Sequence, residues 1–551
     1  METLLHQIHD SWLNPERASS GAKHVAAFLA LTLLLTGSAL ALGPYPITKF
    51  PEDTLYFLSQ GELLLKGYRS SVDFYSMHGP FPFLFAAFGI SVHGISLHSV
   101  VLAQVAGAVV FGCIMFKVAS DRVNGFWSVA LAMAVELLLI SCTPIGGKSW
   151  REFTCAMWYN SIGYCVFAIV FLYLLAPARS SARWKSSTDD ALVGFSLGAL
   201  FLTKLSYFLP AAIVFTVGTV ILPRPPLSRM RGIGVLAAAA AAAWAISTAI
   251  GGSLGQSYAL IESLSLKVSP LTTSLRFAHY TRTIGILGLG LALVVWMAKE
   301  SGQLQAITRE AILAILMVGT VLVAASTSAQ DQEMLPLIGV VPLGLIICLV
   351  GVIRSNAAHV NQYLLTASLC IALLLVVHEP KNSLLSWFFS HANVAVTMAP
   401  KVEFFELRNS EGAKLLADDV DRELLTKFPS DEMSEHFAGM TLLKRAGSER
   451  DQILFVASDY SPINMLTGMR YPVGTVIWWP SSFVGSPDNS TLIEPNYLAD
   501  VDFILRDAKD EVYWQFLMHH RGDYFKRHFR RIAEDSPWIL YARRQAAETS
   551  Y

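Results

Sequence analysis

Residues 24–43 read HVAAFLALTLLLTGSALALG, and residues 51–57 follow them as PEDTLYF. A run of this length without Lys, Arg, Asp or Glu predicts a helix that crosses the ~30 Å hydrocarbon core of a bilayer. The run is too long for the apolar part of a cleaved signal and has no clear small-x-small site after it, so we expect a retained helix. The acidic pair Glu52-Asp53 therefore stands just outside the membrane.

The composition of the whole chain extends this prediction. Its 551 residues are 53% hydrophobic and only 15% charged, and the mean hydropathy is +0.46. These values indicate an integral membrane protein. Apolar runs recur as far as residue 378 and predict about eleven crossings, at roughly 24–43, 96–119, 125–142, 155–177, 191–206, 207–222, 233–252, 283–298, 311–328, 335–353 and 362–378.

The basic residues give the orientation of these helices. With a cytoplasmic N-terminus, the inner loops carry most of the arginines between spans, as the positive-inside rule requires: Arg122, Arg179, Arg183, Arg224, Arg229, Arg231, Arg309 and Arg354. Four polar clusters then face outside and can converge on one cavity: residues 44–80, residues 143–154, the turn around Lys204, and residues 330–333. The apolar segment 79–94 is short and begins with prolines, which favours an interfacial or re-entrant helix.

Beyond residue 378 the composition becomes that of a soluble protein. We expect a transmembrane domain over residues 1–379, with a first outer loop at 44–95, and an extracytoplasmic α/β domain over residues 380–551. Strands are predicted at 451–457, 474–479, 501–505 and 538–541, with a helix at 510–519. The fold class is thus an all-α polytopic bundle with a C-terminal α/β domain. A net charge of −1 gives no sign of the basic surface that a nucleic-acid partner would need, so no such partner is expected.

The acidic pair is a candidate for acid-base chemistry. A carboxyl group between water and hydrocarbon can have its pKa raised towards values that suit a general base. Helix capping is the simpler explanation, because acidic residues favour helix N-termini. The loop is nevertheless too long and too aromatic for a simple connector, since it also carries Glu62, Gly67-Tyr68-Arg69, Asp73, Tyr75 and His78-Gly79-Pro80.

The order of these residues resembles the first outer loop of membrane glycosyltransferases with the GT-C fold, in particular the protein O-mannosyltransferase and aminoarabinose-transferase-like group. The matching features are the acidic pair, Tyr56, Gly67-Tyr68, Asp73, and His78-Gly79-Pro80 before an apolar segment that ends at Gly94. Weaker matches follow in the same order, at residues 157–160, 198–204 and 330–333. The family order is Asp-Glu, and its first carboxylate is the catalytic one, which aligns the catalytic position with Glu52. This chain has the reversed order, with Glu52 before Asp53. Either can be the base, and we favour Asp53 as the shorter group.

The resemblance implies a donor sugar on a polyprenyl phosphate that enters from the membrane. A carboxylate takes the proton of an acceptor hydroxyl as that oxygen attacks the anomeric carbon, with inversion, while cations or a divalent metal stabilise the departing phosphate. The candidate substrate and phosphate contacts are Lys204, Arg151, His78, Asp73, Arg69 and Tyr56. For the cations the alternative is a lipid-headgroup anchor or a snorkelling lysine, and for the tyrosines an interfacial belt.

Two further polar groups are candidates on the acceptor side. Asp331 and Glu333 can bind a metal or orient the acceptor, although a polar turn between helices has the same pattern. In the C-terminal domain, residues 459–462 and 478–480 can form an acceptor surface, or ordinary turn and core structure.

The leading hypothesis is a glycosyltransferase of the cytoplasmic membrane, with its active site and C-terminal domain in the periplasm. The acceptor would be a lipid or an envelope glycan such as a polysaccharide or lipopolysaccharide. The first alternative is a transporter or flippase of lipid-linked or small envelope precursors, which would place its polar groups near the bilayer midplane and have related halves. The second is a non-catalytic assembly partner with the GT-C fold, for which the reversed acidic pair is the only indication.

Overall fold

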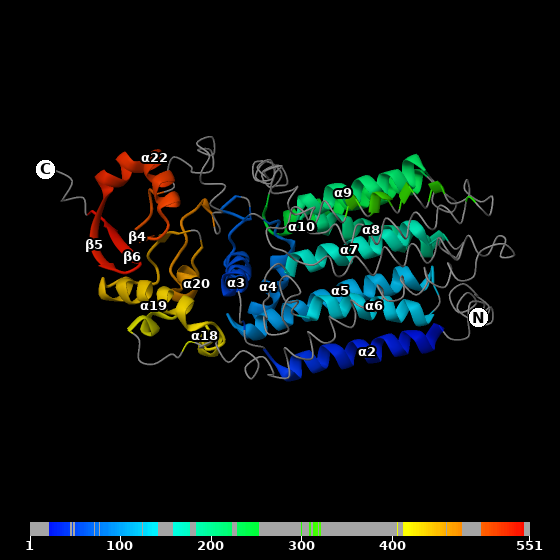
Figure 1. The fold of residues 1–551 in the computed structure, drawn as a ribbon, viewed down its shortest axis with the longest axis horizontal. Coiled ribbons are helices and arrows are strands. Elements are labelled where there is room, and N and C mark those ends of the chain that lie inside the picture. The colour runs from blue at the N-terminus through cyan, green and yellow to red at the C-terminus, as the bar shows by residue number, and fades with distance from the viewer. Residues whose placement is uncertain are drawn as a thin grey trace.

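The computed structural model describes residues 21–44, 50–141, 158–176, 183–222, 229–252, 411–476 and 498–544, apart from 71, 77, 124 and 459, together with residues 47 and 405 and a few between 299 and 320. A bundle of apolar helices forms one end of the molecule, and a mixed sheet with its helices forms the other (Figure 1). Two short helices lie between them.

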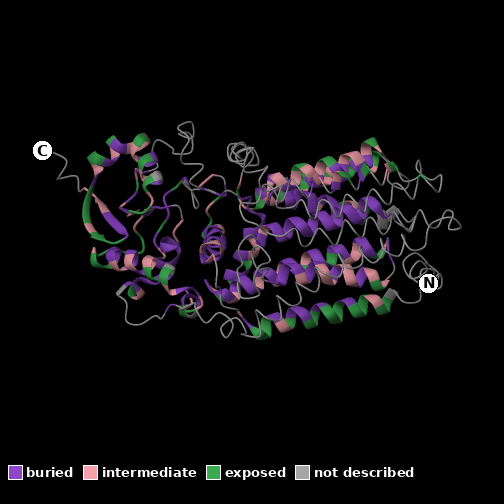
Figure 2. Ribbon diagram, in the orientation of Figure 1, coloured by how far each residue is buried: buried purple, intermediate pink, exposed green. Residues whose placement is uncertain are grey.

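The bundle contains α2 (Gly21–Leu42), α5 (Leu97–Ser120), α6 (Gly125–Ile140), α7 (Trp158–Leu175), α8 (Arg183–Phe201), α9 (Leu205–Thr216) with the π-helical η3 (Val217–Ile221), and α10 (Arg229–Ala249). Among the described residues, four helices are long and apolar enough to cross a membrane: Ala22–Leu42, Leu97–Ser120, Trp158–Leu175 and Arg229–Ala249. Helix α7 is buried along most of its length, whereas α2 exposes many residues (Figure 2). The exposed Leu33, Leu34 and Trp244 suit contact with lipid.

The predicted spans up to residue 252 coincide with helices of the bundle. The spans at 283–298, 335–353 and 362–378 lie outside the described residues, as does most of 311–328, so the number of eleven crossings stays a prediction. Helix α8 begins earlier than predicted, at Arg183. Its polar first turns are accommodated because Asp189 accepts hydrogen bonds from Arg122 at 2.5 Å and Lys117 at 3.0 Å. Buried charges are tolerated in a bundle when they are paired in this way.

Helices α3 (Pro51–Leu65) and α4 (Phe81–His93) lie between the bundle and the C-terminal sheet (Figure 1). With 13 residues, α4 has a length of only ~20 Å, too short to cross a bilayer. This agrees with the interfacial or re-entrant helix expected at residues 79–94. The two helices pack closely at Gly61, where an added Cβ would lie 2.7 Å from the Cβ of Ala86.

The C-terminal part contains η5 (Glu411–Leu415), α18 (Arg422–Leu425), α19 (Ser430–Arg445), β2 (Leu454–Ala457), α20 (Ile463–Thr467), β4 (Phe503–Asp507), α22 (Glu511–His528), β5 (Phe529–Asp535) and β6 (Trp538–Arg543). The strand order is β2-β4-β6-β5, with β2 parallel to β4 and the other neighbours antiparallel. The expectation of mixed helices and strands here is therefore correct. Strand β5 was not predicted, because this edge strand is mostly exposed and lacks an apolar alternation.

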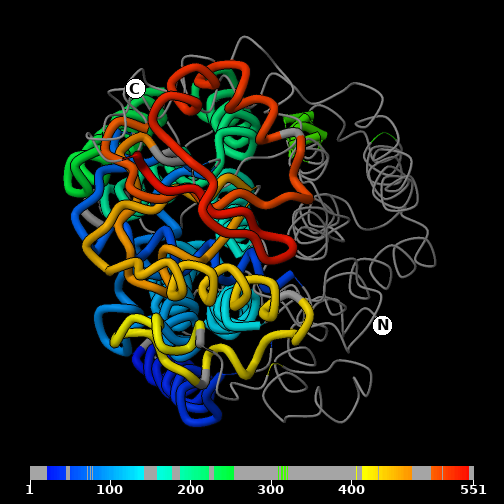
Figure 3. Tube along the Cα trace, turned by 90° about the vertical axis from the view of Figure 1, so that its left-hand side faces the viewer, coloured from blue at the N-terminus to red at the C-terminus, as the bar shows by residue number. Residues whose placement is uncertain are grey.

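The predicted strand at 474–479 has a different partner from the one expected. Its described part, β3 (Thr475–Val476), pairs in parallel with β1 (Phe74–Tyr75) of the first outer loop and not with the domain's own sheet. The backbone N–H of Ile95 also donates to the carbonyl of Asp419, at 2.8 Å. Viewed end-on, the C-terminal part lies over the ends of the bundle helices (Figure 3). These backbone contacts dock it onto the loop that carries the acidic pair.

Candidate functional site

The acidic pair occupies the first turn of α3. The chain enters this helix through Phe50, whose φ of 52° is unusual for a residue with a side chain, and through Pro51 at the first helical position. Glu52 and Asp53 follow directly. The helix start expected from the capping interpretation is thus present, although the residue at the cap position, Phe50, makes no side-chain cap hydrogen bond. A left-handed residue next to two partly buried carboxyl groups is the kind of local strain that clusters at functional sites.

Burial dominates the electrostatics of Asp53. Desolvation, followed by the negative charge of Glu52, raises the pKa of Asp53 to about 7. The helix N-terminus would favour the charged form, so the burial effect outweighs it. Within the described structure, Oδ2 of Asp53 is buried without a hydrogen-bond partner. A carboxyl group with this pKa can accept a proton near neutral pH and release it again.

A close backbone contact brings the end of the first outer loop to the turn between α8 and α9. The N–H of Gly79 donates to the carbonyl of Thr203, and the N–H of Phe81 donates to the carbonyl of Leu202, both at 3.0 Å. A Cβ at position 79 would lie 2.0 Å from the Leu202 oxygen. Only glycine permits this approach without a shift of the backbone. The His78-Gly79-Pro80 sequence is therefore needed to place His78 beside the hairpin turn.

Lys204 is directed into the protein at this turn. Its ammonium group donates to Oδ1 of Asn160 at 3.2 Å, and it lies 4.7 Å from the ring centre of Tyr207 and 5.4 Å from that of Tyr159. The ring centres of His78 and Tyr159 are 3.7 Å apart. Burial, followed by the charge of Lys204, lowers the pKa of His78 well below its ordinary value. The imidazole therefore remains neutral at physiological pH and can hydrogen-bond to a ligand without adding charge.

Tyr56 joins the acidic turn to the C-terminal part. Its hydroxyl lies 2.5 Å from Oγ of Ser76, and its ring centre is 6.0 Å from that of Tyr460, in an edge-to-face arrangement. Oγ of Ser59 lies 3.3 Å from the hydroxyl of Tyr460. Burial raises the pKa of Tyr460, and the nearby charges of Glu52 and Asp53 raise it further. One tyrosine of the C-terminal part thus packs against α3, beside Tyr56 and Ser59.

Two other candidate substrate contacts, Arg69 and Asp73, bind each other in the loop before β1. The guanidinium of Arg69 donates to both carboxylate oxygens of Asp73, each at 2.9 Å, and this ion pair lowers the pKa of Asp73. The two side chains stabilise the loop before β1. Arg151, Asp331 and Glu333 lie outside the described residues.

The described residues contain no group of three or more His, Cys, Asp and Glu side chains that could hold a metal ion. The acidic pair and His78 therefore do not form a ligand set by themselves.

Three parts of the cluster were not assigned from the sequence. Asn160 lies within the weaker match at residues 157–160, and its role as an acceptor for Lys204 depends on the packing of α7 against the turn. Ser76 was not singled out, and Tyr460 was only part of an uncertain acceptor surface. A search for polar residues at the outer ends of predicted spans would have found Asn160, because it lies near the start of α7.

Comparisons with known proteins give a distant likeness only. The chain matches no protein-family model and no curated protein sequence. Among solved structures it is similar to ArnT from Cupriavidus metallidurans in the apo state, with a TM-score of 0.47, 11% identity, and 95% of this chain and 98% of that chain covered. ArnT from the same organism bound to undecaprenyl phosphate gives a TM-score of 0.44 and 12% identity, with 96% and 99% covered.

The oligosaccharyltransferase of Archaeoglobus fulgidus in the apo form gives a TM-score of 0.40 and 12% identity, with 96% of this chain and 75% of that chain covered. These structures are GT-C glycosyltransferases, the group that the first outer loop resembles. All three TM-scores lie below 0.5, so the likeness by itself assigns no activity to this chain.

Proposed function

We propose that the protein is an integral membrane glycosyltransferase that moves a sugar from a polyprenyl-phosphate donor to a lipid or glycan acceptor outside the cytoplasmic membrane. One observation carries the proposal: Asp53, in the first turn of α3, has a pKa raised to about 7 and a buried oxygen without a partner among the described residues. A base with this pKa at the membrane surface suits a hydroxyl acceptor and a lipid-borne donor.

The side chains around Asp53 suit the individual steps of an inverting displacement. Asp53 takes the proton from the acceptor hydroxyl as its oxygen attacks the anomeric carbon. The bond from that carbon to the phosphate oxygen breaks, and the leaving group departs as a lipid phosphate. Lys204 stabilises the negative charge that develops there, and neutral His78 donates or accepts one hydrogen bond beside it.

The transport hypothesis is supported by one observation. Glu136 of α6 is buried in the bundle and accepts a hydrogen bond from Thr32 at 2.8 Å, and intramembrane carboxylates often mark ion pathways. Gly112 of α5 lies against the same carboxylate. A single carboxyl group packed between three helices does not form a path for a substrate, and the larger polar cluster lies at α3. We therefore favour the transferase.

Lys204 provides a test of the phosphate contact. We expect Lys204→Met to lower the transfer rate by roughly 10²–10³-fold, because a preorganised cation is lost where charge develops. Lys204→Arg should retain part of the activity, since the charge stays while the hydrogen bond to Asn160 changes. The measurement is sugar transfer by the full-length protein in nanodiscs. Wild-type transfer by Lys204→Met would show that the reaction needs no phosphate contact from Lys204.

The pH dependence of transfer provides a test of the base. Asp53 accepts a proton only when it is ionised, so the rate should rise with pH, follow the ionised fraction through about pH 7, and level off above it.

Glu62 offers a matched control on the same helix, because burial raises its pKa to about 7 as well. Its carboxylate pairs with Lys66 at 2.6 Å, near the other end of α3. Glu62→Gln should therefore keep the fall in transfer rate below about pH 7, which we call the acidic limb of the rate profile. If the rate of this variant no longer falls at low pH, the titrating group is Glu62 and the assignment of Asp53 fails.

A further inference from the structure

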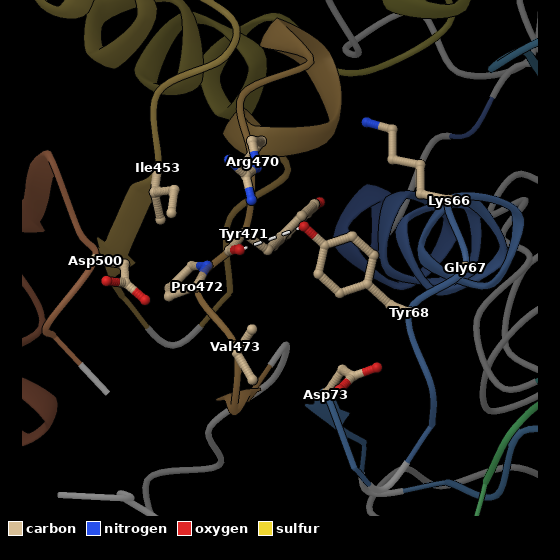
Figure 4. Close-up of a pocket in the computed structure, with 10 residues that line it drawn as sticks. All are labelled: Lys66, Gly67, Tyr68, Asp73, Ile453, Arg470, Tyr471, Pro472, Val473 and Asp500. Carbon is tan, nitrogen blue, oxygen red and sulfur yellow. Dashed lines mark hydrogen bonds between the residues drawn. The ribbon is translucent and has the colours of Figure 1, made fainter. Parts of the chain in front are cut away.

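A pocket lies at the end of α3 that is remote from the acidic pair. Its volume is about 320 Å³, and the first outer loop and the C-terminal part both line it, with Tyr68 and Asp73 from the loop and Arg470, Tyr471 and Asp500 from the C-terminal part. Figure 4 shows Tyr68 facing the segment from Tyr471 to Val473. The volume is near the lower end of the range for small-molecule sites.

Contacts between the first outer loop and the C-terminal part fix the two sides of the pocket relative to each other. The hydroxyl of Tyr68 donates to the carbonyl of Tyr471 at 3.4 Å, and the two ring centres are 6.4 Å apart. The N–H of Gly474 donates to the carbonyl of Asp73 at 2.8 Å, and β1 and β3 pair immediately beyond. A pocket preformed from two parts of the chain loses little conformational freedom when a ligand binds.

The chemistry of the lining favours a carbohydrate. Tyr68 and Val473 provide apolar surface on which the C–H face of a sugar can pack. Asp500 and Arg470 are exposed at the pocket and bring one charge of each sign. The other two charged residues of the lining have partners, since Asp73 pairs with Arg69 and Lys66 pairs with Glu62. Lining that combines aromatic rings with a balanced set of hydrogen-bonding groups suits a neutral, hydroxyl-rich ligand better than a polyanion.

The position of the pocket then restricts what the ligand can be. Lys66, which lines the pocket, follows the last turn of α3, whereas Asp53 lies in its first turn, and the rise along the helix between them is roughly 20 Å. A ligand in the pocket therefore cannot present the reacting hydroxyl itself. We propose that the pocket is an acceptor subsite that holds one sugar unit of an extended envelope glycan, while another unit of the same glycan reaches Asp53. This inference rests on the proposed transferase function.

The test uses the full-length protein in nanodiscs and oligosaccharides released by mild acid from the envelope of its native host. Saturation-transfer NMR measures binding of these oligosaccharides, and a transfer assay gives the acceptor KM and kcat. We expect Tyr68→Ala and Asp500→Asn to lower the saturation signal at least fivefold and to raise the acceptor KM about tenfold, with kcat and the donor KM unchanged. Asp523→Asn, an exposed substitution on α22 that does not line the pocket, should behave as the wild type.

Two variants separate this inference from the function on which it rests. Asp53→Asn should abolish transfer and keep the saturation signal, because binding at the pocket needs no chemistry. Wild-type binding and acceptor KM in Asp500→Asn, a surface change that should not unfold the protein, would overturn the subsite. Displacement of the oligosaccharides by inorganic phosphate would also overturn it, since it would identify an anion site. Full transfer by Asp53→Asn with a lost signal in Asp500→Asn would instead contradict the proposed base.

Discussion

Asp53→Asn should reduce sugar transfer by roughly 10²–10⁴-fold, which is the usual contribution of a general base. The amide has nearly the shape of the carboxyl group but cannot take the proton of an acceptor hydroxyl. The protein should stay folded, because burial disfavours the charged form of Asp53, as its raised pKa shows, and the neutral amide removes that cost. The measurement is transfer in nanodiscs, with mass spectrometry of the envelope glycans as the cellular readout.

Glu52→Gln is the matched control for this prediction. Glu52 contributes negative charge that helps to raise the pKa of Asp53, so its removal should shift the acidic limb of the rate profile to lower pH. The plateau rate should change by less than about tenfold, because no proton transfer passes through Glu52. If Glu52→Gln abolishes transfer and Asp53→Asn does not, the roles of the two carboxyl groups are the reverse of those proposed. If both variants retain full activity, the acidic pair is not the base.

Gly79→Ala should also lower transfer, through a change in packing and not through the loss of a reacting group. The new Cβ would lie 2.0 Å from the carbonyl oxygen of Leu202, so the backbone must separate from the hairpin turn. We expect a cost of about 1–3 kcal/mol in docking and the loss of the hydrogen bond from Gly79 to Thr203. His78 would then move away from Tyr159 and Lys204, and transfer should fall by at least tenfold while the bundle remains folded.

Gly234→Ala is the control for this variant, because Gly234 lies in α10 with nothing within 4 Å of an added Cβ. This substitution should leave transfer unchanged and can stabilise the helix slightly. Thermal unfolding in detergent separates the two possible causes of lost activity. Wild-type transfer by Gly79→Ala would show that the contact between the loop and the hairpin turn is not needed for the reaction.

The fold was predictable where the membrane imposes a simple rule. Four described helices are apolar and long enough to cross the bilayer, and α2 and the helices from α5 to α10 lie close to the apolar runs predicted. The hairpin turn at Lys204 followed from the same rule, since the apolar segment around it is too long for one crossing and carries a lysine at its middle. The C-terminal strands were predicted where they are buried, and β5 was missed because it is exposed.

The sequence by itself determined that the chain is a polytopic membrane protein, that Glu52 and Asp53 begin a helix outside the first span, and that Lys204 lies at a turn. These features depend on local hydrophobicity and on helix starts, which neighbouring residues set. Only the tertiary structure decided what surrounds the acidic pair. Burial and the charge of Glu52 raise the pKa of Asp53, and Gly79 contacts the hairpin turn. Tyr460 packs beside Ser59 although the two residues are about 400 positions apart in the chain. Such contacts depend on how distant segments pack in space, which a local pattern does not encode.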